Sequence, residues 1–280
     1  MRQPLLELKH VEISYFGKPV VHDLSLQIEP GEILGIVGES GSGKSTVIRA
    51  AMGLLGNRGA VTKGNIYYKG QNVTEAGEKE LRKIRGPEMG MVFQNPGASL
   101  SPIRTIEKQL YETVLEHEKT STRDIRERAL KIFETMGLPD GEEILKSYPF
   151  QLSGGMNQRV GIMMAMVQNP RLLFADEPTS ALDVTIQAQV VKEMMKMREI
   201  YGTAIAIVTH NIGLVEYMAD KVAVMYKGRL VEYGTKEEVI RHPREDYTKK
   251  LIGAVLRLNR GESHESTGGV RETEWKKSWK

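Results

Sequence analysis

The feature that most constrains this chain is a glycine-rich segment, GESGSGKST at residues 38–46, which directly follows a short apolar run, ILGIV at residues 33–37. A continuous apolar run of this length is typical of a strand buried on both faces of a parallel sheet. The segment itself matches the GxxxxGK[ST] spacing of a phosphate-binding loop, and a helical stretch follows it. This order predicts an α/β fold with a phosphate site where the strand meets the helix.

Glycines in such a loop leave backbone N–H groups free to converge on an anion, and the following helix adds the positive end of its dipole. Lys44 can reach the outer phosphates of a nucleotide, and the Ser45 hydroxyl can ligate Mg²⁺. The residues predicted to cradle the nucleotide are Gly38, Ser40, Gly41, Gly43, Lys44, Ser45 and Thr46.

A second apolar run, LLFA at residues 172–175, ends in the carboxylates of Asp176 and Glu177. The carboxyl ends of parallel strands are where α/β proteins bind ligands, so we expect both acids near the phosphate loop. Because successive strand residues point in opposite directions, the two acids can take separate roles. Asp176 is predicted to hold Mg²⁺, and Glu177 to orient or deprotonate the water that attacks the terminal phosphate.

A third segment, LSGGM at residues 152–156, begins a helix with Ser153 and two glycines. Small residues and exposed N–H groups at a helix start form a phosphate-binding design of their own. One terminal phosphate does not need two cradles from the same chain, so we expect this one to serve a nucleotide held by another subunit. Taken alone, the segment is better explained as a simple helix-initiating turn.

These motifs, in this order, resemble the ATPase subunits of ABC transporters over residues 5–258. In that family's pattern, Gln94 in MVFQNP matches the glutamine loop, Asp183 in SALD the D-loop, and His210 in IVTHN the switch histidine. Tyr15 in ISYFGK matches the aromatic residue that stacks on adenine, and stacking suits an aromatic ring. The resemblance implies an ATPase that uses Mg²⁺ and couples ATP hydrolysis to solute transport.

The resemblance also implies that two ATPase subunits sandwich two ATP molecules head to tail. Each ATP then lies between the phosphate loop of one chain and the signature, residues 152–156, of the other. The implied roles are catalysis by Glu177, His210 and Lys44, metal binding by Ser45, Gln94 and Asp176, and contacts across the interface by Ser153, Gly155 and Asp183.

Longer stretches, among them SYPFQLSGGMNQRV and HPREDYTKKL, are similar to the ATPases of dipeptide and oligopeptide importers. Met156 stands where most of the wider family has glutamine, a substitution typical of one of the two ATPase types in these importers. The implied partners are a paralogous ATPase in a heterodimer or a second copy of this chain, two transmembrane permease subunits, and an extracytoplasmic solute-binding protein. The expected location is the cytoplasmic face of the cell membrane, and the cargo stays open between peptides, nickel and oligosaccharides.

The expected fold is α/β, with a mainly parallel, RecA-like phosphate-loop core, an antiparallel β part and an inserted helical subdomain. Residues 1–95 and 168–234 are expected to form the nucleotide-binding core, and residues 96–167 the helical subdomain. Residues 235–280 are expected to form a C-terminal extension whose tail becomes polar from about residue 259.

Local patterns predict several elements around this core. Alternating apolar and polar residues predict half-exposed antiparallel strands at 6–15 and 24–28. Thr235-x-x-Glu238 predicts the start of one more helix. A helix is also predicted after the capping signal Ser121-x-x-Asp124, with a buried stripe of Ile125, Ala129, Ile132, Phe133 and Met136.

Charge and composition exclude several classes of function. The 39 Lys and Arg residues against 36 Asp and Glu give a net charge of +3 over 280 residues, too weak a field to indicate a nucleic-acid partner. The absence of cysteine excludes disulfides and the cysteine-ligated iron–sulfur cluster that many relatives carry near the C-terminus. The longest apolar stretch, at 160–167, is far below the roughly 18–20 residues that span a bilayer. A pair of tryptophans, Trp275 and Trp279, is better explained by a frayed terminus than by docking on a partner.

Two other functions stay open at this point. A soluble ABC-type ATPase that acts on DNA or the ribosome would share these motifs. The interval between phosphate loop and signature contains no coiled coil, however, and the chain has a single set of motifs. A phosphate-loop kinase or GTPase would leave SGGM, SALD and the histidine unexplained.

Overall fold

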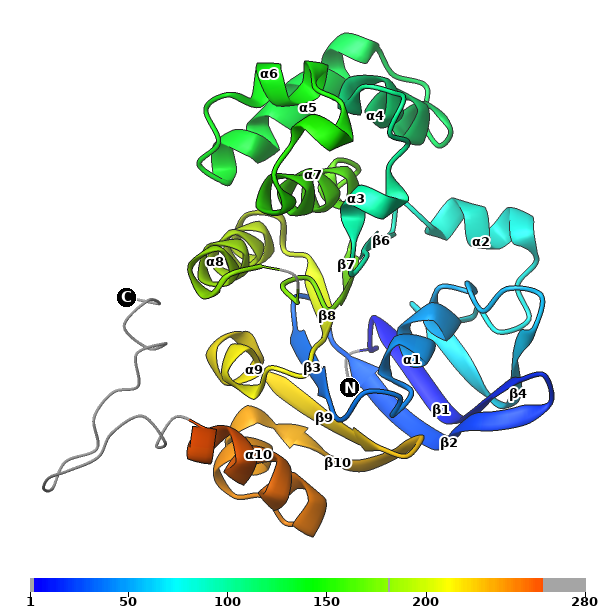
Figure 1. Cartoon of the computed structure of the whole chain (residues 1–280). Helices are drawn as coiled ribbons and strands as arrows, with labels where there is room; N and C mark the ends of the chain where they lie inside the picture. The colour runs from blue at the N-terminus through cyan, green and yellow to red at the C-terminus, as the bar shows by residue number, and fades with distance from the viewer. Residues whose placement is uncertain (1–2, 181, 259–280) are drawn as a thin grey trace, which may run out of the picture.

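The computed structural model describes residues 3–180 and 182–258, and its centre is a mainly parallel sheet of strand order β10-β9-β3-β8-β7-β6 (Figure 1). All pairs in this sheet are parallel except β10 with β9. Every residue of β3, β7 and β8 is buried, as expected for strands covered on both faces. The strands are β3 (Ile33–Val37), β6 (Met89–Val92), β7 (Leu172–Asp176), β8 (Ala204–Val208), β9 (Lys221–Tyr226) and β10 (Arg229–Thr235).

A second, antiparallel sheet of order β2-β1-β4-β5 forms the N-terminal part, as the alternating pattern predicts. Its strands are β1 (Leu6–Tyr15), β2 (Lys18–Ile28), β4 (Gly59–Tyr68) and β5 (Gln71–Asn72). β2 begins six residues earlier than the prediction, because Lys18 pairs with Tyr15 across a tight turn. The first three residues of β2 are all exposed, so the apolar pattern gave no sign of them.

Between β6 and β7 the chain is helical, and these helices gather at one end of the molecule (Figure 1). They are α3 (Pro96–Ser99), α4 (Ile106–Leu115), α5 (Thr122–Thr135), α6 (Gly141–Lys146), η1 (Pro149–Gln151) and α7 (Gly154–Met166). The predicted cap of α5 is confirmed, because the Ser121 hydroxyl accepts a hydrogen bond from the Asp124 N–H at 3.1 Å. The predicted apolar stripe of α5 is buried throughout.

The remaining helices flank the two sheets or follow them. They are α1 (Lys44–Ala51), α2 (Glu78–Ile84), α8 (Val184–Tyr201), α9 (Ile212–Met218), η2 (Glu237–Arg241) and α10 (Asp246–Leu258). The helix predicted at Thr235 is only the short π-helical η2, although Thr235 and Glu238 make the predicted reciprocal hydrogen bonds. It ends before Pro243, because the residue before a proline disfavours helical backbone angles.

Alternate residues of the parallel strands face two apolar clusters. Leu34 and Ile36 of β3 pack with α1 and the antiparallel sheet. Ile33 and Val37 belong to the other cluster, which runs from β3, β7 and β8 into α4, α5, α7, α8 and α9. In residues 3–180 and 182–258, no helix has the length and apolar character needed to cross a bilayer. The Trp275 and Trp279 prediction lies outside the described residues.

Candidate active site

A pocket of about 620 Å³ lies where the phosphate loop follows β3, Glu177 follows β7, and His210 lies beyond β8. It brings together ten of the predicted site residues, namely Tyr15, Ser40, Gly41, Gly43, Lys44, Ser45, Thr46, Gln94, Glu177 and His210. Val20 of β2 also lines it, and no sequence signal marked this residue, because a valine in a strand carries no chemistry of its own. The pocket therefore combines residues of the antiparallel sheet with residues that follow the ends of the parallel strands.

The backbone of the phosphate loop requires glycine at its first position. Gly38 has a φ of 149°, and a Cβ atom built there would lie 2.1 Å from the carbonyl oxygen of Met225 on β9. Any side chain would therefore push the loop away from β9. At the other end, Gly43 has a φ of 97° and is the N-cap residue of α1, so the loop leads directly into the helix N-terminus, where backbone N–H groups are free.

Lys44 is a buried cation held by neutral oxygens. Its Nζ donates hydrogen bonds to the carbonyl oxygens of Gly38 and Glu39, both at 2.8 Å. Burial lowers the pKa of Lys44, while the carboxylates of Glu177 and Asp176 oppose that shift. An ammonium group that has lost its water in this way gains strongly from a nearby anion.

Oxygen ligands suitable for a divalent cation lie beside Lys44. The Ser45 hydroxyl donates a hydrogen bond to Oδ1 of Asp176 at 2.7 Å, and Asp176 is buried. Hydroxyl and carboxylate oxygens suit Mg²⁺, and Gln94 adds an amide oxygen to the same pocket. Arg49 approaches the other carboxylate oxygen at 3.8 Å, a contact the sequence analysis missed. Its spacing, four residues after Ser45 on one helix, is the signal that could have revealed it.

Glu177 lies just beyond the end of β7 and leaves the direction of the strand. Its φ is 46°, and its N–H donates to the carbonyl oxygen of Val208 at 2.8 Å. We expected strand alternation to point Asp176 and Glu177 in opposite directions. That reason is wrong, because β7 ends at Asp176 and Glu177 has left-handed backbone angles outside the strand. The Oε1 atom of the Glu177 carboxylate lies 3.3 Å from Nδ1 of His210, which is exposed.

Ser153, Gly155 and Asp183 lie outside this pocket. Ser153 is the exposed N-cap residue of α7 and accepts a hydrogen bond from the N–H of Met156 at 3.2 Å. Asp183 is the exposed N-cap residue of α8 and accepts one from the N–H of Ile186 at 3.0 Å. The starts of α7 and α8 touch, since a Cβ on Gly155 would lie 3.0 Å from the Ile186 side chain. The side chain of Met156 packs against the apolar cluster that includes Ile33 and Val37.

A buried ion pair joins α7 to α8 farther along. Nε of Arg159 donates to both carboxylate oxygens of Glu193, at 3.0 and 3.1 Å, and the two side chains are 7% and 4% exposed. Burial raises the pKa of Glu193, and Arg159 opposes that shift. The helices that begin at Ser153 and Asp183 are thus fixed to each other.

Comparison with known proteins supports what this geometry indicates. A model of the ABC transporter family matches residues 21–180. The chain is 42% identical over 258 residues to the dipeptide transport ATP-binding protein DppD of Lactococcus lactis subsp. cremoris (strain MG1363), covering 90% of this chain and 74% of that protein. It is also 42% identical over 268 residues to the oligopeptide transport ATP-binding protein OppD of Bacillus subtilis (strain 168), covering 94% and 75%.

Solved structures give the same result for the fold. A dimeric post-hydrolysis state of the ATP-binding cassette MJ0796, bound to ADP and Pi, has a TM-score of 0.72 and 28% identity, covering 82% of this chain and 98% of that one. The protein cbiO1 from Clostridium perfringens, part of the ABC transporter complex cbiONQ, has a TM-score of 0.76 and 27% identity, covering 92% and 97%. The expected fold class is confirmed. The chain belongs to the ABC transporter family and is an ATP-hydrolysing, ATP-binding subunit.

Proposed function

We propose that this chain drives peptide import as one half of a head-to-tail ATPase dimer. One observation carries the proposal: the phosphate loop shares a pocket with Glu177 and His210, whereas Ser153 and Asp183 are exposed outside it. Exposed cap residues with no role in their own chain's pocket are suited to the nucleotide of a facing chain. The dimeric MJ0796 cassette and the dipeptide and oligopeptide transport names of the relatives support this assignment.

The pocket can bind ATP along its length. Tyr15, half-buried at the end of β1, offers a ring for adenine. Lys44 would exchange its carbonyl partners for phosphate oxygens, which satisfy a desolvated cation better. Ser45, Gln94 and Asp176 would hold Mg²⁺, which offsets phosphate charge when it is bound. The further ATP contacts proposed are the backbone N–H groups of Gly38, Ser40, Gly41, Gly43 and Thr46, with the hydroxyl groups of Ser40 and Thr46.

Hydrolysis then depends on Glu177 and on the facing chain. Glu177 takes a proton from water as the water oxygen bonds to the terminal phosphorus and the bond to the ADP oxygen breaks. His210, 3.3 Å from the Glu177 carboxylate, orients it and reaches the terminal phosphate. Ser153 and Gly155 of the facing chain bind that phosphate, and Asp183 packs across the interface. Loss of the phosphate removes these contacts, so the dimer opens.

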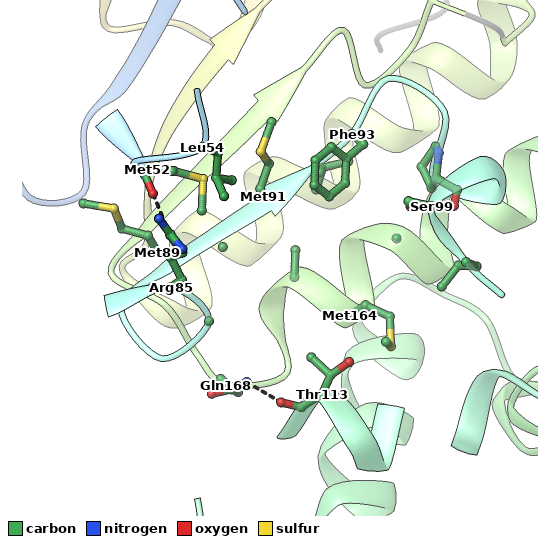
Figure 2. A pocket seen from close by; sticks show the side chains of 17 residues that line it. Met52, Leu54, Arg85, Met89, Met91, Phe93, Ser99, Thr113, Met164 and Gln168 are labelled. Carbon is green, nitrogen blue, oxygen red and sulfur yellow. Dashed lines mark hydrogen bonds between the residues drawn. The ribbon is translucent and has the colours of Figure 1, made fainter. Parts of the chain in front are cut away.

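An apolar groove beside the pocket suits a segment of a permease subunit. It has a volume of about 290 Å³, and Figure 2 shows Met91 and Phe93 on the β6 side with Ser99 and Met164 on the helical side. Phe93 is 42% exposed and directly precedes Gln94. A permease segment that displaces Phe93 would therefore also displace Gln94 in the pocket. A neighbouring groove of about 530 Å³ shares Ser99 and Met164 and extends this surface.

The assembly we propose contains this chain, a paralogous ATPase or a second copy, two permease subunits and an extracytoplasmic binding protein. It would hold the chain on the cytoplasmic face of the membrane. Within the chain, residues 96–167 would move as the helical subdomain against the core formed by 1–95 and 168–234, and residues 235–280 would form the C-terminal extension. The transport names of the relatives favour this function over an ATPase that acts on DNA or the ribosome.

Ser153→Arg tests the contribution of the facing chain. A long charged side chain at the start of α7 should block the head-to-tail contact, so ATP-driven dimerisation fails while a single chain still binds ATP with unchanged affinity. Light scattering with ATP measures dimerisation, and calorimetry measures binding.

The matched control is Ser121→Arg. Ser121 caps α5 with the same kind of hydrogen bond, 3.1 Å against 3.2 Å for Ser153, and is also exposed. If both variants dimerise like the parent, or both lose dimerisation equally, the assignment of Ser153 to the facing chain's nucleotide is wrong.

Cargo is tested by deleting the gene in its source organism and measuring uptake of labelled solutes. We expect uptake of dipeptides or oligopeptides to fall to background, and a plasmid copy carrying Glu177→Gln to fail to restore it. Normal peptide uptake together with loss of nickel or oligosaccharide uptake would contradict the peptide assignment.

A further inference from the structure

We propose that Tyr247, in the first turn of α10, is a positioning residue for the phosphate loop and ties ATP affinity to the C-terminal extension. Its hydroxyl oxygen accepts a hydrogen bond from the backbone N–H of Glu39, with 3.1 Å between oxygen and nitrogen. The two residues are 208 positions apart. The contact therefore comes from the tertiary fold and has no local cause.

Tyr247 holds the same stretch of backbone that Lys44 holds from inside the pocket. The Lys44 ammonium binds the carbonyl oxygens of Gly38 and Glu39, while Tyr247 binds the N–H of Glu39. When Lys44 turns to phosphate oxygens, as we propose, those two carbonyls lose their cation. The hydroxyl of Tyr247 then remains as an anchor on this turn of the loop.

The ring of Tyr247 is itself fixed. Its centroid lies 4.1 Å from that of Tyr226, with 30° between the ring planes. Tyr226 ends β9, and the preceding residue, Met225, provides the carbonyl oxygen against which Gly38 fits. Burial raises the pKa of Tyr247, so the group is a neutral hydroxyl near neutral pH.

A second contact, made by a different segment, also holds the phosphate loop. The N–H of Gly228, in the turn between β9 and β10, donates to the carbonyl oxygen of Ser42 at 3.1 Å. The loop is thus held from outside at two points, Glu39 and Ser42. Anything that displaces α10 would release the first of them and leave the second.

Tyr247→Phe removes the hydroxyl and keeps the ring that packs against Tyr226. Without this hydrogen bond, ATP would have to order the loop when it binds. The free-energy cost of that ordering weakens ATP binding. We expect the Kd and KM for ATP to rise by about 3- to 10-fold, the range of one hydrogen bond, while kcat at saturating ATP stays within about twofold. Calorimetry measures Kd, and steady-state kinetics separates KM from kcat.

The matched control is Tyr233→Phe. The Tyr233 hydroxyl donates to the backbone carbonyl oxygen of Gln27 at 2.8 Å, which joins β10 to β2 away from the phosphate loop. Both variants lose one bond between a tyrosine and the backbone, so both should lower Tm by a similar amount. Only Tyr247→Phe should raise the KM for ATP. Equal KM values for the two variants would leave Tyr247 a purely structural residue and overturn the inference.

This inference rests on the proposed role of the phosphate loop in ATP binding, so Lys44→Ala is measured in parallel. We expect that variant to weaken ATP binding at least about 10-fold, because a charge-assisted contact is lost. If Lys44→Ala bound ATP normally, the loop assignment itself would fail. If Lys44→Ala lost binding and Tyr247→Phe kept parental Kd and KM, only the role of Tyr247 would be wrong.

Discussion

Replacing Glu177 with Gln is expected to lower kcat for ATP hydrolysis by about 10²- to 10⁴-fold, the usual contribution of a general base. The amide keeps the shape of the side chain, but it cannot take the proton from the attacking water. Lys44 and Ser45, the residues proposed to contact the phosphates, are untouched, so the Kd for ATP should stay within about threefold. With chemistry blocked, the ATP-bound dimer should persist, and light scattering should detect it as a long-lived species.

The control for this experiment is Glu127→Gln, which makes the same change of charge on the exposed face of α5. It should hydrolyse ATP at the parental rate. His210→Ala should also lower kcat. Combining it with Glu177→Gln should cost little beyond the single change, because His210 is proposed to act through the Glu177 carboxylate, which lies 3.3 Å away. Parental turnover by Glu177→Gln would refute the role of Glu177, and fully additive losses would separate His210 from it.

Arg159→Met is expected to lower the free energy of unfolding by about 3–5 kcal/mol, the usual cost of removing one partner from a buried ion pair. Glu193, 4% exposed, would lose the cation that forms hydrogen bonds with its carboxylate, and only the more weakly acting Lys196 would still offset its charge. Guanidinium unfolding followed by circular dichroism measures the change.

The double variant Arg159→Met, Glu193→Leu removes both charges and should recover most of that loss, since apolar pairs often replace buried ion pairs at little cost. Arg123→Met breaks the exposed pair with Glu127 and should change stability little. A single Arg159→Met variant as stable as the parent would contradict the importance of the pair.

The pH dependence of Arg159→Met follows from the pKa of Glu193. Burial already raises this pKa, and without Arg159 it rises further. The loss of stability is therefore full above the folded-state pKa. It shrinks as the pH falls from there toward the ordinary glutamate pKa, because the folded chain takes up a proton that the unfolded chain does not.

Much of the pocket could be predicted because its motifs are local. The loop at 38–46 encodes its own turn, and the continuous apolar runs at 33–37 and 172–175 identify the buried strands that lead to this loop and to Asp176. Strand ends at one sheet edge must meet, so the residues that follow them meet as well. For this reason the phosphate loop and Glu177 share one pocket without any knowledge of strand order, whereas Tyr15, Gln94 and His210 were predicted from the family resemblance.

What could not be predicted depends on contacts between distant segments. The hydrogen bond from Glu39 to Tyr247 spans 208 positions, and HPREDYTKKL shows a tyrosine with no sign of its partner. The left-handed backbone of Glu177 was also hidden, because acidic residues usually take ordinary backbone angles. The sequence also did not predict the first six residues of β2. The side chains of Lys18–Val20 are exposed, so only backbone pairing with β1 identifies this part as a strand.

The apolar cluster shared by the sheet and the helical segment has a mechanical consequence. Close-packed interiors compress little, so a push on α4 or α7 cannot be absorbed where it is applied. The same cluster includes Ile33, Leu173 and Ile207, whose strands lead to the phosphate loop, Asp176 and His210. Force applied to α4 or α7 by a partner subunit would thus reach three strand ends at once, and a change at those ends would be passed back through the same cluster.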